Sequence, residues 1–82
     1  MMTPTIHLNG TPKERLLEQI ENAYGKLGEA IKALANAAPN GRDYYPQGSD
    51  AIYRAQDEHS ARMKKLLEVR KELEDLANAL PV

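Results

Sequence analysis

Apolar residues recur at alternating steps of three and four along two long stretches of the chain, the spacing of one face of an α-helix. In the first stretch the stripe consists of Leu16, Ile20, Ala23, Leu27, Ala30 and Leu34, widened on one flank by Leu17, Tyr24 and Ile31. In the second stretch it consists of Ile52, Ala55, His59, Arg62 or Met63, Leu66, Val69, Leu73, Leu76 and Leu80. The pattern predicts two long helices, the second with a polar first half and an apolar second half.

Residues typical of helix ends flank both stretches. Thr11 is a good N-cap, Pro12 suits the first helical position, and Glu14 completes a capping box, so the first helix is predicted over residues 12–37. Ser49 and Asp50 are both competent N-caps, so the second helix is predicted over residues 50–79, before a proline.

The remaining segments are an N-terminal arm, residues 1–10, and a loop, residues 38–49. The arm favours an extended conformation that Pro4 interrupts and Asn9-Gly10 ends; an edge strand paired with a symmetry mate is one alternative for it. A loop of this length between two helices predicts an antiparallel hairpin. The fold class is therefore all-α: residues 1–82 form one domain, a two-helix hairpin with an extended arm.

Composition changes this picture in two ways. A chain of 82 residues without cysteine, phenylalanine or tryptophan has a small core and no disulfides. A two-helix hairpin also leaves half of each apolar stripe exposed to solvent. We therefore expect a homo-oligomer, either a four-helix bundle or a larger ring. The net charge of −1 and the lack of a long apolar run predict a cytoplasmic protein that binds neither membrane nor DNA or RNA polymers.

Two glycines lie inside the first predicted helix, where each costs about 1 kcal/mol relative to alanine. Gly25 projects opposite the stripe, so the simplest interpretation is a tolerated weakness on an exposed face. The alternative for Gly25 and Gly28 is the close approach of another backbone or of a ligand.

The loop carries more chemistry than a connection needs. Prolines stiffen it, Gly41 and Gly48 allow sharp turns, and its polar groups suit an anionic ligand that contains a ring. Arginine binds phosphate through two N–H groups and tyrosine stacks on bases. The first candidate site, with contributions from the second helix, consists of Arg42, Asp43, Tyr44, Tyr45, Gln47, Arg54, His59 and Arg62. The structural alternative pairs Arg42 with a loop carboxylate, packs the tyrosines over the bundle end and buries His59.

A second candidate cluster precedes the first helix, where free backbone amides attract anions. It consists of His7, Asn9, Gly10 and Thr11. Capping alone is the alternative explanation for Thr11. The cluster lies at the opposite end of the first helix from the loop, so the two candidate sites meet only across an antiparallel dimer.

Catalysis and metal binding find little support. The chain lacks the spacing of a catalytic triad and of a phosphate-binding loop, and the adjacent Asp57, Glu58 and His59 would lie on three different faces of a helix. We therefore predict a protein that is not an enzyme and has no cofactor and no metal.

Three blocks of the sequence resemble a family of small phage and prophage proteins of mostly unassigned function. They are residues 6–11, residues 39–46, and the spaced residues Ala55, His59 and Arg62. The resemblance implies a phage origin and action in the host cytoplasm. The expected architecture is also similar to that of phage sponge proteins, which sequester cyclic dinucleotides or cyclic ADP-ribose isomers.

These features together lead to two functional hypotheses. The first is an oligomeric binding protein that sequesters a phosphorylated nucleotide signal in intersubunit pockets and so antagonises host immunity. The second is a structural or adaptor protein, in virion assembly or host-protein binding, that uses the Arg42–Gly48 loop as a docking site.

Overall fold

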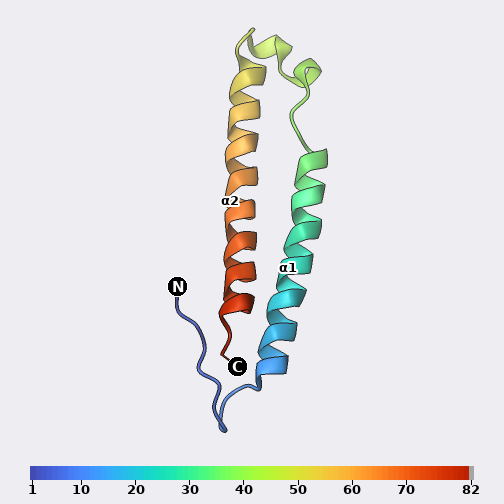
Figure 1. Cartoon of the computed structure of the whole chain (residues 1–82). Helices are drawn as coiled ribbons and strands as arrows, with labels where there is room; N and C mark the ends of the chain where they lie inside the picture. Colours follow the sequence, from blue (N-terminus) through green and yellow to red (C-terminus); the bar gives the residue numbers. More distant parts are fainter. Residues whose placement is uncertain (82) are drawn as a thin grey trace.

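The computed structural model describes residues 1–81 and consists of two antiparallel α-helices that lie side by side (Figure 1). Helix α1 spans Lys13–Asn36 and α2 spans Ala51–Ala79; two short 3-10 turns, η1 (Gly41–Asp43) and η2 (Tyr45–Gln47), connect them. Residues 1–81 contain no strand, so the all-helical prediction is confirmed, and an arm strand that pairs with a second copy stays a prediction. The molecule is elongated, 62 × 20 × 16 Å. Within the described residues neither helix is long and apolar enough to cross a membrane.

Both helices begin one residue later than predicted, and neither uses the predicted side-chain cap. Pro12 occupies the N-cap of α1 in an extended conformation, and its carbonyl accepts bonds from the N–H groups of Arg15 and Leu16, each at 3.1 Å. The capping box is therefore wrong, because Thr11 lies one residue too far from the free amides. Asp50 is the N-cap of α2, but it has a helical φ of −92° and its carboxylate makes no capping bond.

The helices meet along a thin interface, here called the seam, whose members are partly buried. From α1 it includes Leu17, Ile20, Tyr24, Leu27, Ile31 and Leu34, and from α2 it includes Ile52, His59, Met63, Leu66, Arg70 and Leu73. Among the described residues, Ala55 and Leu80 are almost completely buried, with 8% and 6% of their surface exposed.

Three members of the predicted stripes are exposed to solvent. Ala23 and Ala30 are exposed, and so is Val69, with 47% of its surface accessible. Their neighbours Tyr24, Ile31 and Arg70 face the opposite helix instead. For α1 the reason is size, since turning the larger side chains inward buries more apolar surface than turning alanines inward. At the position left open between Arg62 and Met63, methionine is the residue that faces α1.

Arg70 is the polar exception in the apolar half of the seam. Its guanidinium carbon lies 4.4 Å from the centre of the Tyr24 ring, a cation–π arrangement. Gly28 leaves room for it, because a Cβ there would lie 3.4 Å from Nη2 of Arg70. The Nε atom is buried and has no hydrogen-bond partner among the described residues. Gly28 thus accommodates a side chain of the same molecule, whereas Gly25 faces open space, as its surface interpretation predicts.

Ion pairs lie on the solvent side of the helices. Lys26 pairs with Glu29 at 3.5 Å and Lys71 with Asp75 at 2.9 Å; the latter hydrogen bond raises the pKa of Lys71. Exposed pairs of this kind contribute little to stability. The hairpin therefore depends on the seam.

Replacing Gly25 by alanine should stabilise the protein by about 1 kcal/mol, because it removes the helix cost of glycine where nothing obstructs a Cβ. The midpoint of thermal unfolding should rise by roughly 4 to 8 °C. Gly28→Ala is the matched comparison and should gain less, since its methyl group meets the Arg70 guanidinium. A loss of stability in Gly25→Ala would show that another backbone approaches this glycine.

Arg70→Met should keep the stability of the protein or raise it by up to about 1 kcal/mol, because it removes a buried N–H without a partner while filling a similar volume. Denaturant unfolding at fixed protein concentration measures this. Arg70→Ala, which also removes the packing of the side-chain stem, should destabilise the protein. A large loss in Arg70→Met would mean that another chain supplies an acceptor to this arginine.

Candidate functional site

The loop between the helices folds into a compact cap over the first turns of α2. The Asn40 side-chain oxygen accepts a hydrogen bond from the Arg42 N–H at 3.1 Å, and the Asn40 carbonyl accepts one from Asp43 at 3.0 Å. These bonds begin η1, and η2 follows directly. The chain then reverses at Gly48, whose φ of 113° favours glycine over any other residue. The loop is thereby held back against α2.

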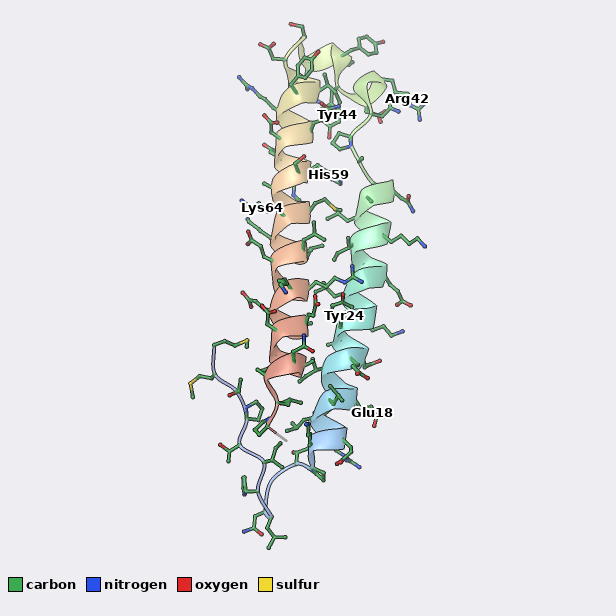
Figure 2. All side chains as sticks on the ribbon, viewed as in Figure 1. Glu18, Tyr24, Arg42, Tyr44, His59 and Lys64 are labelled. Carbon is green, nitrogen blue, oxygen red and sulfur yellow. The ribbon has the colours of Figure 1, made fainter. Side chains whose placement is uncertain are left out.

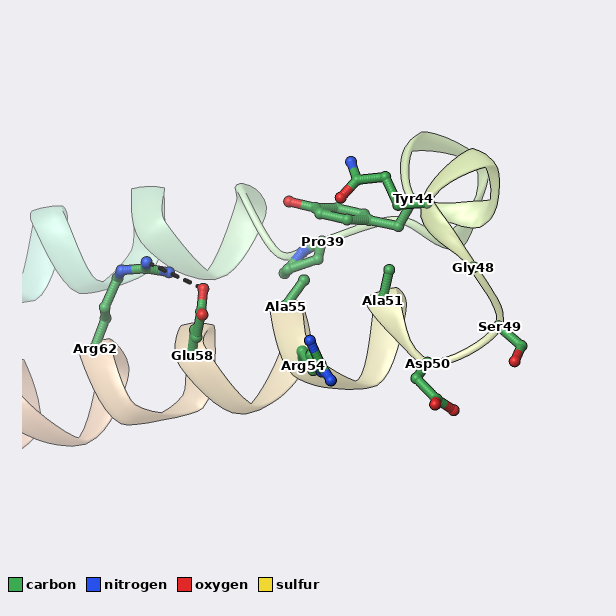
Figure 3. Close-up of a pocket in the computed structure, with 11 residues that line it drawn as sticks. Pro39, Tyr44, Gly48, Ser49, Asp50, Ala51, Arg54, Ala55, Glu58 and Arg62 are labelled. Atoms are coloured by element: carbon green, nitrogen blue, oxygen red, sulfur yellow. Dashed lines mark ion pairs between the residues drawn. The ribbon is translucent and has the colours of Figure 1, made fainter.

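Between this cap and α2 lies an open groove of about 580 Å³, here called the loop-end groove (Figure 3). Its lining residues are Pro39, Tyr44, Gln47, Gly48, Ser49, Asp50, Ala51, Arg54, Ala55, Glu58 and Arg62. In the close-up the ring of Tyr44 lies on the loop side, across from Ala51 and Ala55 of α2. The groove therefore has an aromatic wall and a floor of small side chains.

Charged residues alternate in sign along the helical rim of the groove. Asp50, Arg54, Glu58 and Arg62 follow one another at intervals of four residues, so they lie on one face of α2. Arg62 reaches Glu58 at 3.7 Å with both side chains largely exposed, which makes this a weak ion pair. Arg54 forms no ion pair with any described residue. One arginine is thus available to an anion, and a second is held only loosely.

The structure gathers four of the predicted site residues in this groove: Tyr44, Gln47, Arg54 and Arg62. Arg42, Asp43 and Tyr45 belong to the same loop but do not line the groove, and Tyr45 has 76% of its surface exposed. His59 lies in the seam (Figure 2), so it does not share a polar notch with Arg62. No ion pair joins Arg42 to a described carboxylate.

The arm cluster lies at the other end of the hairpin (Figure 1). There the Gly10 N–H donates to the His7 carbonyl at 3.1 Å, and the His7 imidazole folds onto Gly10, where a Cβ would come within 2.7 Å of Nε2. Asn9 and Thr11 are exposed. Within one chain, therefore, these residues and the loop-end groove form separate clusters, as predicted.

Sequence reasoning missed the two carboxylates of the groove. Asp50 was interpreted only as a helix cap and Glu58 was assigned to no site, yet both line the groove. Their four-residue spacing from Arg54 and Arg62 was the available signal. No comparable signal in the sequence predicted that Pro39 would line the groove, because its position depends on how the loop folds back onto α2.

The groove offers groups that can recognise a ligand. The arginines and the Gln47 amide donate hydrogen bonds, the carboxylates accept them, and the Tyr44 ring can stack on a planar group. In residues 1–81 no three histidine, aspartate or glutamate side chains gather in a way that would hold a metal ion.

Comparisons with protein-family models, with curated proteins and with solved structures find no match to this chain.

Proposed function

We propose that this protein is a non-enzymatic, homo-oligomeric binding protein whose loop-end groove takes a phosphorylated nucleotide. The observation that carries the proposal is the Tyr44 ring standing across the groove from the rim with Arg54 and Arg62. A base or other planar ring would stack on the tyrosine while the arginines hold a phosphate. The volume of about 580 Å³ lies within the range of small-molecule sites.

The alternating charges of the rim narrow the ligand class. Two carboxylates beside two arginines repel a highly charged polyphosphate but suit a ligand with one or two phosphates and several hydroxyl or amino groups. Asp50 and Glu58 would accept bonds from such donors. Cyclic dinucleotides and cyclic ADP-ribose isomers have this composition, which fits the proposed role in sequestering a host signal.

The loop-end groove of a single chain is incomplete as a binding pocket, and an oligomer would close it. The groove opens to solvent, whereas a ligand held tightly loses most of its own surface to the protein. In the proposed oligomer a second chain closes the groove, and the arm residues His7, Asn9, Gly10 and Thr11 are suited to this because they offer amide and imidazole donors. The site would then be an intersubunit pocket in a phage protein acting in the host cytoplasm.

A second candidate function is a docking protein, and the exposed tyrosines favour it. Tyr45 and Tyr53 expose 76% and 65% of their surface at the loop end of the molecule. Tyrosine and arginine are frequent anchors of protein interfaces. In this reading Arg42 and Tyr45 bind a structural or host protein.

Tyr44→Ala should weaken binding of a cyclic dinucleotide or cyclic ADP-ribose isomer about 10- to 100-fold, the loss of roughly 1 to 3 kcal/mol for one stacked base. Isothermal titration calorimetry measures it. Tyr45→Ala is the matched control, since it removes a neighbouring tyrosine that does not line the groove. Absence of binding by the unaltered protein to every ligand of this class would sink the proposal.

Arg54→Gln should cause a comparable loss, because a charge-assisted bond to phosphate contributes roughly 1.5 to 3 kcal/mol. Arg15→Gln, an exposed arginine of α1, should leave the affinity unchanged. The docking function makes the opposite prediction: Tyr45→Ala would release a bound protein, measured by co-purification, while Tyr44→Ala and Arg54→Gln would retain it.

A further inference from the structure

Each helix carries a second row of residues beside the seam, most of them exposed. In α1 it consists of Leu16, Ala23 and Ala30, and in α2 of Arg62, Val69 and Leu76, each spaced by seven residues. Seven residues are about two helical turns, so the members of a row lie above one another. We call these the outer rows. Ala23, Ala30, Arg62 and Val69 are all exposed.

Both outer rows flank the seam on the same side of the hairpin. A smaller groove of about 140 Å³ marks the other side, because it is lined by Glu21 of α1 and by Glu74 and Asn78 of α2. The outer row of α2 lies on the opposite side of that helix from the smaller groove. Its member Arg62 lines the loop-end groove, which therefore lies on the outer-row side. By helical periodicity Leu16, Ala23 and Ala30 lie across the seam from Glu21. The two outer rows and the loop-end groove therefore share one face.

The two sides of α1 differ in charge. The outer row and its immediate neighbour Leu27 contain no charged residue, whereas the seven-residue row on the other side begins with Glu14 and Glu21. Alanines in the outer row allow another helix to approach closely. On α1, the outer-row side is therefore the one suited to helix packing.

The surface area of the chain indicates how much remains to be covered. The chain exposes 6465 Å², whereas a compact monomer of 9.1 kDa exposes about 4,900 Å². The excess of roughly 1,500 Å² exceeds the roughly 800 Å² that each partner contributes to a standard stable interface. A second copy is an occupant of sufficient size.

Charge sets the direction in which a second copy would lie. We divide the hairpin at the middle of α2, between Lys65 and Leu66, and at the same height in α1, between Ile31 and Lys32. The half with the arm holds eight Asp or Glu and five Lys or Arg, and the half with the loop holds six Lys or Arg and four Asp or Glu. Parallel stacking would place like halves together, whereas antiparallel stacking places opposite charges together.

We infer that two copies of this chain pack face to face through the outer rows with their long axes antiparallel, so that α1 crosses its own copy and α2 crosses its own copy. This arrangement brings the arm end of each chain toward the loop-end groove of the other. It thereby specifies the intersubunit pocket of the proposed function, on which this inference builds. The pairing itself is tested without ligand.

The first test is the mass of the protein in solution, measured by light scattering and by sedimentation at several concentrations. The unaltered chain should be a dimer or a multiple of one. Ala30→Lys places a charge in the outer row and should weaken association at least tenfold. Ala35→Lys is the matched control: it makes the same change at an exposed alanine on the other side of α1, and should leave the dimer intact.

The second test measures direction. Because the chain has no cysteine, single cysteines at Ala61 and Ala79 of α2 can each carry one spin label. If the two-fold axis of the dimer passes near the middle of α2, antiparallel pairing separates the two Ala79 sites by roughly 40 Å along the helix direction. It places the two Ala61 sites roughly 15 Å apart. Parallel pairing gives short distances, roughly 20 Å or less, at both sites.

A long distance at Ala79 with a short one at Ala61 supports the inference, provided that Ala30→Lys alone disrupts the dimer. A monomer, equal short distances, or disruption by Ala35→Lys and not by Ala30→Lys would overturn it. Nucleotide binding by a protein that fails these tests would leave the groove as a site and remove only the pairing. A correct dimer that binds no nucleotide would remove only the proposed ligand.

Discussion

Two helices alone can bury only one narrow strip of each other, and this limit governs the rest of the structure. Both helices carry apolar rows wider than that strip. As a result the seam residues remain half-buried, and among the described residues near-complete burial is reached by one alanine beneath the loop and one leucine after the end of α2. At about 25 cal/mol per Å² a seam of this kind yields modest stabilisation, and no disulfide supplements it. The length of the molecule follows from the same limit, because nothing folds the hairpin back on itself.

The loop end differs from the seam because backbone geometry, not apolar burial, shapes it. The Asn40 turn, the two 3-10 turns and the positive φ of Gly48 hold the loop against α2. This fold turns Tyr44 toward the helix and leaves its neighbour Tyr45 in solvent. Two adjacent tyrosines thus face different environments, which is why they separate the two candidate functions. A groove built by a stiff loop on a helix is also preorganised, so little ordering would oppose ligand binding.

Periodicity and turn residues predicted the two helices, their boundaries to within one residue, and the antiparallel hairpin. The side of each helix that faces inward was less predictable, because α1 has apolar residues over more than one face and the choice of Tyr24 and Ile31 over Ala23 and Ala30 depends on the partner helix. The candidate site was predicted in part. Tyr44, Gln47, Arg54 and Arg62 lie together, but His59 turned into the seam and Asp50 and Glu58 were missed, since the path of the loop decides which side of α2 it covers.

Arg70 occupies the seam position that the hydrophobic periodicity predicts for Val69, and this difference links the seam to the proposed assembly. A hairpin optimised on its own would place the valine inward and the arginine outward, yet here Val69 is 47% exposed and the Arg70 Nε is buried without a described partner. Stacking on Tyr24 beside Gly28 offsets only part of that cost. Local conflicts of this kind are expected where a sequence serves a second contact. A second copy on the outer rows would bury Val69 and Leu76. The side of α2 that carries Arg70 would then face α1, and the side that carries Val69 and Leu76 would face the partner.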